Sequence, residues 1–438
     1  MAAKMRIIAP EKEKGKKIVI IVGGGFGGLN AAKRLGGKEG LHILLFDHRN
    51  LHLFQPLLYQ VATAGLNPSD IAVPIRAQFT EVPNVEVHLL KLTGVNLTEK
   101  YVIGMTPRGN VEIAFDYLVL ACGARHSYFG HPEWEEFAPG LKTLEQATEI
   151  RRRILLAYEL AENELDPAVQ NTLLTFIIVG AGPTGVELAG AISDISRTVL
   201  VRDFKRIDPS RSRVLLLEAG PRILSSFHED LSARAVQYLR ELGVEVRTAA
   251  RVENITAHGV QIGSEFIASE NVFWAAGVQA ASMDFTPPVA RDRAGRIFVE
   301  KDFSLPQHPD VFVIGDMAAF ESAPGKLLPG LAPAAIQAGR FVGDTICADQ
   351  RGEKRTEFKY KDKGQLATIG KSRGILEVGR IRMGGLLAWL AWLFVHIFYL
   401  IGFRNRISVM WEWMWSYLFS KRNARLIGEK EWRFKDQK

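Results

Sequence analysis

Two parts of the chain repeat one succession of apolar and polar positions: a short apolar run, a glycine-rich turn, a stretch with helical spacing and a second apolar run. The first copy occupies residues 17–22, 29–35 and 41–47, and the second occupies residues 173–179, 186 onward and 213–218. Short continuous apolar runs on either side of a helix are typical of buried parallel strands. The pattern predicts two β-α-β units, and hence a duplicated domain rather than a short-period repeat.

The segments between and after these units are expected to complete two sheets. Residues 143–164 have helical periodicity, whereas residues 111–124, 265–277 and 297–315 have the pattern of extended segments. No low-complexity linker separates these parts, as expected if the second unit is inserted into the first. We predict an α/β protein with two Rossmann-like dinucleotide-binding domains, the second inserted into the first, plus a C-terminal apolar helical region. The expected boundaries are 1–142 and 281–370 for the first domain, 143–280 for the second and 371–438 for the C-terminal region.

A glycine fingerprint, G-x-G-x-x-G, stands at the start of each predicted helix. In the first copy, Gly23 permits a tight turn, Gly25 lets the backbone approach a pyrophosphate, and Gly28 lets helix and strand pack closely. The phosphate then rests on amides at the helix N-terminus. Asp47, at the end of the next strand, can accept a hydrogen bond from a ribose hydroxyl. The first copy is therefore predicted to bind a dinucleotide.

The second copy repeats this arrangement with Gly180, Gly182, Gly185 and Glu218. Glu218 follows at a longer interval than the usual ~20 residues, which a longer loop before the strand explains. An acid at this position favours NADH, because it accepts a hydrogen bond from the free 2′-hydroxyl and repels a 2′-phosphate. Arg222 lies nearby in the sequence, so tolerance of NADPH stays open.

Two dinucleotide pockets in one chain suggest a permanently held FAD and a nicotinamide nucleotide that binds and leaves. Gly315-Asp316, after an apolar run, resembles the second FAD motif of flavoproteins with two dinucleotide-binding domains, in which the Asp holds the ribityl chain. The residues that match the two A-x-G turns of those flavoproteins are Ala121 and Gly123, and Ala276 and Gly277. The resemblance implies that the first domain binds FAD and the second binds NADH.

Two longer segments narrow the resemblance to one family. Residues 52–63 (HLFQPLLYQVAT), which include Gln55 and Pro56, look like the segment that lines the flavin in type II NADH:quinone oxidoreductases, and residues 182–187 (GPTGVE) are similar to the same family. The similarity extends from about residue 17 to residue 427. It implies that NADH passes a hydride to FAD and that two electrons then go to a membrane quinone, without proton pumping.

The same resemblance implies catalytic roles for three residues. Glu187 matches a carboxylate that can position a substrate or handle a proton beside the flavin; the alternative is an acid that stabilises the start of a helix. Ala335 and Gln337 match the family's quinone-site motif A-Q-x-A-x-Q, in which Pro333 here replaces the first Gln. A solvated helix glutamine is the alternative for Gln337. Lys371 resembles a basic residue near the flavin, and its alternative is a surface lysine.

Composition and charge limit the functional classes. The net charge is +7, and much of the basic excess flanks the most apolar stretch, which favours a membrane surface over nucleic acid as partner. Cys122 and Cys347 are far apart, with no CxxC and no metal-ligand spacing, so neither a metal site nor a redox disulfide is expected. Residues 1–17 are charged throughout and are not expected to form a secretory signal.

The apolar stretch near the C-terminus is the expected membrane anchor. Residues 383–402 carry no formal charge and could span a core of about 30 Å. Basic residues flank both sides, however, and residues 421–438 hold seven Lys/Arg against three Asp/Glu, so the positive-inside rule places both ends in the cytoplasm. Residues 407–419 have the pattern of an interfacial helix, with Trp411 and Trp415 on one face. We therefore expect a monotopic anchor on the cytoplasmic face of the cell (inner) membrane; a single transmembrane helix at 383–402 and a homodimer or core surface are the alternatives.

Three other functions share parts of this pattern. A sulfide:quinone oxidoreductase has a similar fold and membrane docking but needs cysteines poised at the flavin to carry sulfur. An NADH-dependent ferredoxin-type reductase would not need a Trp-rich C-terminal region. A non-enzymatic NADH-binding redox protein, similar to apoptosis-inducing factor, would use the basic surface for a partner.

Overall fold

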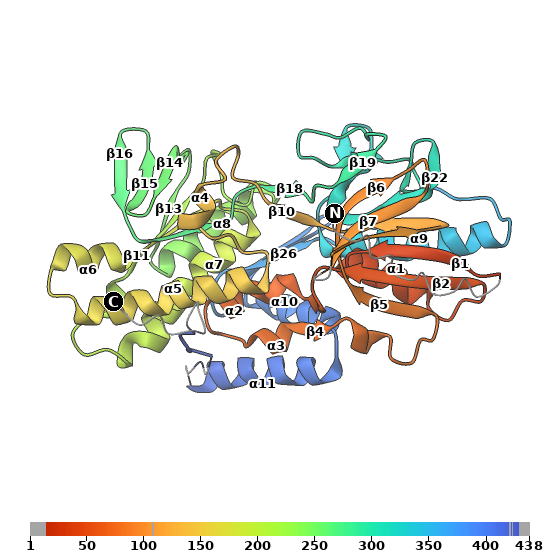
Figure 1. Cartoon of the computed structure of the whole chain (residues 1–438). Helices are drawn as coiled ribbons and strands as arrows, with labels where there is room; N and C mark the ends of the chain where they lie inside the picture. Colours follow the sequence, from red (N-terminus) through yellow and green to blue (C-terminus); the bar gives the residue numbers. More distant parts are fainter. Residues whose placement is uncertain (1–14, 107–108, 420–421, 423, 429–438) are drawn as a thin grey trace. The chain divides into compact units, whose positions relative to one another are not determined.

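The computed structural model describes residues 15–106, 109–419, 422 and 424–428 (Figure 1). The N-terminal arm that we expect not to be a secretory signal, and most of the basic tail after residue 420, lie outside the described residues. The chain divides into two compact units. Unit 1 comprises the chain up to His52 together with Val73–Arg125 and Val278–Lys363, and unit 2 comprises Leu53–Ala72, His126–Gly277 and the chain from Gly364 onward.

The central sheet of unit 1 has the strand order β21-β22-β9-β1-β2-β5. Its strands are β1 (Lys17–Val22), β2 (Leu41–Asp47), β5 (Val85–Leu89), β9 (Tyr117–Leu120), β21 (Ser304–Leu305) and β22 (His308–Val313). β1 runs parallel to both β2 and β9, and β22 runs parallel to β9. All but the first residue of β1 are buried, as expected of a strand in the middle of a parallel sheet. The helices α1 (Phe26–Leu35) and α9 (Ala332–Gln350) pack against each other in this unit.

Smaller elements complete unit 1 and its connections to the 53–72 segment. A second sheet has the order β19-β6-β7-β8, and the other strands pair two by two as β10-β18, β20-β23, β24-β25 and β3-β4. Their bounds are β3 (Leu51–Leu53), β4 (Ala72–Pro74), β6 (Lys91–Asn96), β7 (Tyr101–Thr106), β8 (Gly109–Ala114), β10 (Ala124–His126), β18 (Val278–Ala280), β19 (Asp284–Thr286), β20 (Ile297–Phe298), β23 (Ala318–Ala319), β24 (Glu321–Ala323) and β25 (Lys326–Leu327).

Unit 2 is built on the parallel sheet β13-β12-β11-β17. Its strands are β11 (Thr175–Val179), β12 (Arg213–Leu217), β13 (Val244–Arg247) and β17 (Asn271–Trp274), and a small antiparallel sheet holds β14 (Asn254–Thr256), β15 (Gly259–Ile262) and β16 (Glu265–Ala268). The helices before the C-terminal part are α2 (Leu58–Ala62), α3 (Pro68–Ile71), α4 (Trp134–Phe137), α5 (Leu144–Asn163), α6 (Pro167–Leu173), α7 (Pro183–Asp194) and α8 (Glu229–Glu241). α7 continues as a π-helical turn over Ile195–Val199.

The C-terminal part of unit 2 starts with the antiparallel strands β26 (Gln365–Thr368), β27 (Gly374–Val378) and β28 (Ile381–Gly385) and ends with the helices α10 (Leu386–Tyr399) and α11 (Phe403–Phe419). The alternative of one transmembrane helix at 383–402 is therefore wrong, because this stretch starts in β28 and α10 ends at Tyr399. Among the described residues, no helix combines the length and the apolar character needed to cross a membrane.

The periodic elements lie where the sequence predicts them, with shifted ends. The predicted strand at 173–179 begins only at Thr175, because Asp166 caps a short helix that starts at Pro167 and runs to Leu173. The helix expected at 143–164 is α5, and its cap is a reciprocal pair of hydrogen bonds between Thr143 and Gln146. The α/β dinucleotide-binding fold is confirmed.

The contact between α1 and α9 gives a stability prediction. A Cβ on Gly339 would lie 2.1 Å from the carbonyl oxygen of Gly27, so Gly339→Ala should lower the free energy of unfolding by about 3 kcal/mol through overpacking. Gly343→Ala should cost less, because its Cβ would meet side-chain carbons of Arg34 rather than backbone. Urea unfolding measures the free energies of the two variants. Arg340→Ala, at an exposed position of the same helix, is the control. Equal stability of Gly339→Ala and wild type would contradict the prediction.

Candidate active site

The first glycine turn forms an open cradle at the end of β1. Gly23 has a φ of +104°, and a Cβ there would lie 2.3 Å from the carbonyl oxygen of Ala121. A Cβ on Gly28 would lie 1.9 Å from the carbonyl oxygen of Gly23. Gly25 differs, because no atom within 4 Å would oppose its Cβ. The first and third glycines thus serve the fold, while the second leaves free space of the kind that a pyrophosphate needs.

Two side chains hold this cradle in place. The carboxylate of Asp47 accepts hydrogen bonds from the amides of Gly24, at 2.6 Å, and Arg49, at 2.8 Å. His52 is buried, and its Nδ1 lies 2.8 Å from the carbonyl oxygen of Gly24. Burial lowers the pKa of His52, so the ring is neutral near pH 7 and Nδ1 is the nitrogen that donates. Asp47 therefore shapes the loop as well as ending β2 where a ribose acceptor is expected.

The other residues predicted to bind FAD in unit 1 follow neighbouring parallel strands. Ala121 and Gly123 follow β9, and Gly315 and Asp316 follow β22, so both pairs lie at the sheet edge that also holds the glycine turn after β1. Gly315 has a φ of +69°, and a Cβ there would face the Cβ of Ala335, in the first turn of α9, at 3.6 Å. The carboxyl ends of parallel strands are where open α/β sheets bind nucleotides. Gln55 and Pro56, in the 3₁₀ turn that precedes α2, belong to unit 2.

Unit 2 repeats the cradle. A Cβ on Gly180 would lie 2.6 Å from the amide nitrogen of Ala276, and one on Gly185 would lie 1.9 Å from the carbonyl oxygen of Gly180, whereas Gly182 faces open space. The carboxylate of Glu218 accepts from the amides of Ala181 and Gly220, both at 2.8 Å. This is the arrangement that Asp47 has in unit 1. In each unit, the open space at the second glycine of the turn fits the pyrophosphate of a dinucleotide.

Two further features of unit 2 bear on the nucleotide. Gly277, after β17, has a φ of +69°, and a Cβ there would lie 2.4 Å from the ring of Phe129. The guanidinium of Arg222 donates to the carbonyl oxygens of Phe227, at 3.1 Å, and Ser225, at 3.0 Å. Arg222 is thus held by its own loop.

Glu187 lies on α7, two residues after the last glycine of the second turn. Burial of its carboxyl raises the pKa to about 8, and this shift persists although the Thr368 backbone and the Trp392 indole favour the charged form. No basic side chain contributes to the pKa of Glu187. A carboxyl with a pKa near neutral pH can take up and release a proton under physiological conditions.

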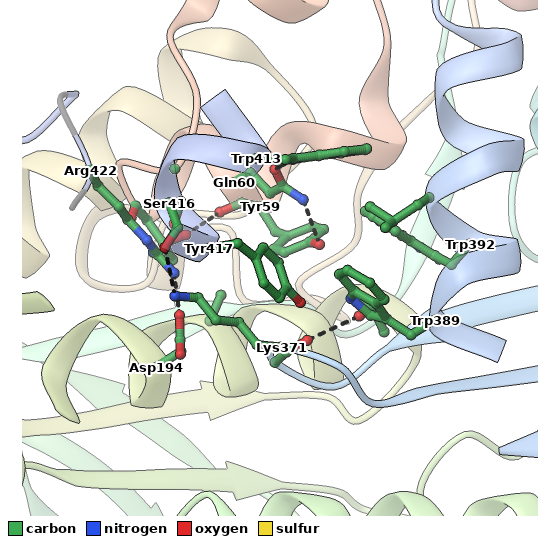
Figure 2. A pocket seen from close by; sticks show the side chains of 16 residues that line it. Tyr59, Gln60, Asp194, Lys371, Trp389, Trp392, Trp413, Ser416, Tyr417 and Arg422 are labelled. Atoms are coloured by element: carbon green, nitrogen blue, oxygen red, sulfur yellow. Dashed lines mark hydrogen bonds and ion pairs between the residues drawn. The ribbon is translucent and has the colours of Figure 1, made fainter. Parts of the chain in front are cut away.

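A cleft that is partly open to solvent lies in unit 2 beside this helix (Figure 2). Aromatic side chains from α2, α10 and α11 form much of its wall, namely Tyr59, Trp389, Trp392, Trp413 and Tyr417. Lys371 also lines the cleft, and its Nζ donates to the carbonyl oxygen of Ser416 at 3.2 Å. Burial lowers the pKa of Lys371, Asp194 opposes this shift, and Arg422 adds to it.

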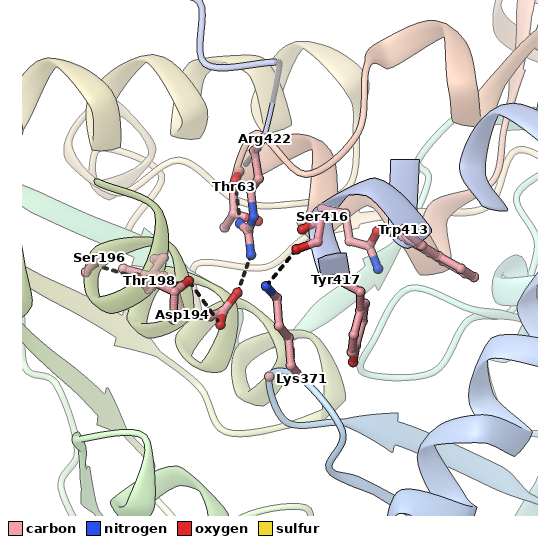
Figure 3. A network of polar contacts seen from close by, with 12 residues as sticks. Thr63, Asp194, Ser196, Thr198, Lys371, Trp413, Ser416, Tyr417 and Arg422 are labelled. Carbon is pink, nitrogen blue, oxygen red and sulfur yellow. Dashed lines mark hydrogen bonds and ion pairs between the residues drawn. The ribbon is translucent and has the colours of Figure 1, made fainter. Parts of the chain in front are cut away.

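Two of the residues that line the cleft form a buried ion pair (Figure 3). Arg422 donates to the carboxylate of Asp194 at 2.5 Å and to the carbonyl oxygen of Thr63 at 2.8 Å. The side chains of Arg422 and Asp194 are 9% and 6% exposed. The pair therefore connects the end of α7, the α2 segment and the chain that follows α11.

The three predicted catalytic residues have different surroundings. Thr368, whose backbone bears on the pKa of Glu187, lines the same cleft as Lys371, so this part of unit 2 brings the two predicted residues into one region. Gln337 belongs to unit 1, where its amide donates to the carbonyl oxygens of Pro333 and Lys361 and accepts from the Lys361 amide at 3.0 Å. Gln337 is thus partly exposed and hydrogen-bonded to backbone on both ends of its amide.

Sequence reasoning missed most of the cleft. Tyr59 and Gln60 stand in the recognised 52–63 segment, which is the signal that could have selected them. Asp194 and Arg422 had no local signal, because a charge that is buried by a distant partner looks the same in the sequence as a solvated one.

The comparisons with known proteins agree with this geometry. The sequence profile of the pyridine nucleotide-disulphide oxidoreductase family matches residues 17–339, and that of the NDH2 C-terminal domain matches residues 363–422. The type II NADH:quinone oxidoreductase Ndh of Mycobacterium tuberculosis is 40% identical over 425 residues, which cover 94% of this chain and 90% of that protein. NdhA, a second such enzyme of that organism, is 39% identical, with 95% and 91% covered.

Two solved structures show the fold. NDH2 from Plasmodium falciparum in complex with NADH has a TM-score of 0.86 at 18% identity, covering 94% of this chain and 100% of that one. The sulfide:quinone oxidoreductase of Aquifex aeolicus has a TM-score of 0.69 at 19% identity, covering 92% and 95%.

Paired nucleotide cradles and the matched profile define a pyridine nucleotide-disulphide oxidoreductase, the class of flavoproteins that react with nicotinamide nucleotides. Within this class, the chain belongs to the type II NADH:quinone oxidoreductases, since its similarity to members of that family extends over nearly its whole length and includes the C-terminal domain.

The raised pKa of Glu187 gives a prediction for stability against pH. The carboxyl ionises near pH 4.5 in the unfolded chain but near pH 8 in the folded one, so stability falls as pH rises between these values. Glu187→Gln removes this loss. Relative to wild type, the variant should therefore gain about 4 kcal/mol in free energy of unfolding between pH 5 and pH 8.5.

Urea unfolding at the two pH values measures this difference. Glu149→Gln is the control: although burial opposes it, the hydrogen-bonded Arg152 and Arg153 lower the pKa of Glu149 to about 2. This carboxyl is therefore ionised in both the folded and the unfolded chain over this pH range, and the difference between Glu149→Gln and wild type should hardly change with pH. A pH-independent difference between Glu187→Gln and wild type would contradict the assignment.

Proposed function

We propose that this protein oxidises NADH and reduces a membrane quinone, with FAD held by the cradle in unit 1 and NADH bound by the cradle in unit 2. FAD, when bound, supplies a centre that accepts a hydride and returns two electrons. The single observation that carries the proposal is the duplicated cradle, in which Gly25 and Gly182 alone among the fingerprint glycines face open space. The domain boundaries that we expect, with FAD at 1–142 and 281–370 and NADH at 143–280, are part of this proposal.

The residues of unit 2 favour NADH over NADPH. The Glu218 carboxylate lies at the tip of β12, where it accepts a ribose hydroxyl and repels a 2′-phosphate. Arg222 donates to two carbonyl oxygens of its own loop, which holds its guanidinium toward that loop. These contacts favour a structural role for Arg222 over binding of a 2′-phosphate.

Glu187 is proposed to handle the proton that accompanies quinone reduction. Its pKa of about 8 makes it a proton donor at neutral pH, and no cation holds it in the charged form. Lys371 supplies positive charge to the cleft that Thr368 also lines, which favours an electron-rich, partly reduced substrate. Gln337 is proposed to position the Lys361 segment through its backbone contacts.

The chemistry of the thiols argues against a sulfide:quinone oxidoreductase. Burial raises the pKa of Cys122 to about 12, so this thiol stays protonated and is a poor nucleophile at neutral pH. Burial also raises the pKa of Cys347, and both cysteines are free. The described structure therefore supports direct electron transfer to quinone rather than a sulfur relay.

The last two helices are proposed to bind a bilayer surface. On α10, every fourth residue from 386 to 398 is an exposed apolar side chain, and Trp392 on the opposite face is buried. The exposed apolar residues of α11 are Phe403, Ile407, Met410, Trp411, Met414, Tyr417, Leu418 and Phe419. Apolar surface of this extent on a helix pair, with exposed basic residues nearby such as Arg404, is typical of interfacial anchoring. We place this surface on the cytoplasmic face of the inner membrane; a homodimer is the alternative.

The reaction itself is tested with the purified holoprotein. We expect a yellow protein whose flavin is bleached anaerobically by NADH and recoloured by a quinone. With NADPH, kcat/KM should fall by about tenfold or more, because one repulsive charge contact costs at least about 1.4 kcal/mol. Sulfide should not bleach the flavin, and sulfide-dependent bleaching or a flavin unreactive to NADH would overturn the proposal.

Membrane binding is tested with two substitutions on the exposed faces. The double variant Phe394→Glu/Leu418→Glu should reduce flotation with anionic vesicles at least about tenfold, because it places charge in the apolar surface. Leu165→Glu, at a side chain that is 83% exposed on the α5–α6 loop, is the matched control and should float like wild type. Loss of a dimer in the double variant, with no vesicle binding by wild type, would assign the surface to self-association instead.

A further inference from the structure

The side chains of Trp413, Gln60 and Tyr59 are joined by two successive hydrogen bonds (Figure 2). These bonds determine whether the Tyr59 hydroxyl donates or accepts. The indole Nε1 of Trp413 donates to Gln60 Oε1 at 2.7 Å, and Gln60 Nε2 donates to the hydroxyl oxygen of Tyr59 at 2.9 Å. An indole N–H can only donate and an amide NH₂ can only donate, so the order of the chain cannot be reversed. The Tyr59 oxygen is therefore the acceptor, and its own proton is left to donate elsewhere.

This proton has no hydrogen-bonded acceptor among the described residues, although the side chain is 7% exposed. Burial is the main reason why the pKa of Tyr59 lies well above its ordinary value, and Glu187 adds to the shift. The hydroxyl thus stays protonated across the physiological range. A buried donor without an acceptor is unfavourable, so a ligand in the cleft that brings an acceptor oxygen gains affinity from it.

The surroundings restrict the ligand to a flat molecule with such an oxygen. Trp389, Trp392 and Trp413 line the cleft with Tyr59 and offer aromatic faces to a planar ring. Resting on the proposed quinone reduction, we propose that Tyr59 donates a hydrogen bond to a carbonyl oxygen of the quinone and that Gln60 and Trp413 are positioning residues for that donor. The bond orients the ring and needs no proton transfer from the phenol.

The test removes the hydroxyl and keeps the ring. Tyr59→Phe should lower kcat/KM for a short-chain quinone by about tenfold, mostly through a higher KM, which is the loss expected for one hydrogen bond. Anaerobic flavin reduction by NADH should change less than twofold. Turnover with ferricyanide, an acceptor without a carbonyl group, should also change less than twofold.

Positioning through the amide is tested separately. Gln60→Met keeps the length of the side chain but removes both hydrogen bonds, and Trp413→Phe removes only the outer one. Both variants should raise the quinone KM in the same direction as Tyr59→Phe, by a smaller factor. Neither should alter turnover with ferricyanide.

Tyr158→Phe is the matched control. Its hydroxyl is also buried in unit 2, but Ser196, at 2.7 Å, and Ser212, at 3.0 Å, already pair with it. This variant should lower the melting temperature and leave the quinone KM unchanged.

The outcomes separate this inference from the proposed function. A wild-type protein that reduces ferricyanide but no quinone would refute the proposed function. A wild-type protein that reduces quinone, with a Tyr59→Phe variant of the same quinone KM, would refute the inference alone. If Tyr59→Phe shifts the pH profile as Glu187→Gln does and leaves the quinone KM unchanged, the phenol serves the carboxyl, and the inference is again refuted.

Discussion

Each nucleotide cradle depends on one close contact between a helix and the turn that precedes it. In unit 1 the carbonyl oxygen of Gly23 lies against the Cα of Gly28, and in unit 2 that of Gly180 lies against Gly185; a Cβ at either position would come within 1.9 Å of the oxygen. No side chain fits there. The helix N-terminus therefore approaches the strand end closely enough for its amides to line the free space before it, and the carboxylates of Asp47 and Glu218 tie the same turns to the next strand.

Local contacts explain which parts of the molecule can be predicted from its sequence. The β1–α1 and β11–α7 turns depend on residues that are close in the sequence, so their glycines and apolar runs are sufficient to predict both turns. The cleft is different, because its hydrogen bonds join distant residues: Trp413 and Gln60 are 353 positions apart, and Arg422 and Asp194 are 228. Lys371 was selected only through resemblance, and its place beside the flavin stays a prediction.

Two carboxyls on α7 show how differently burial acts on a charged group with a partner and on one without. Asp194 is buried next to Arg422, which compensates its charge within hydrogen-bond distance. Glu187 is buried without such a partner, and its pKa rises to about 8. The raised pKa leaves the Glu187 carboxyl able to exchange a proton near neutral pH.

The position of Arg422 after the last helix has a consequence for biosynthesis. Asp194 is translated long before its counter-charge, and a buried carboxylate without a partner costs several kcal/mol. The nascent chain can form the parallel sheet of unit 2 early. Arg422, which hydrogen-bonds both the end of α7 and the α2 segment, becomes available to them only when residue 422 has left the ribosome. Folding of the parallel sheet and completion of the cleft walls are therefore separable events, because the second needs a residue 228 positions after Asp194.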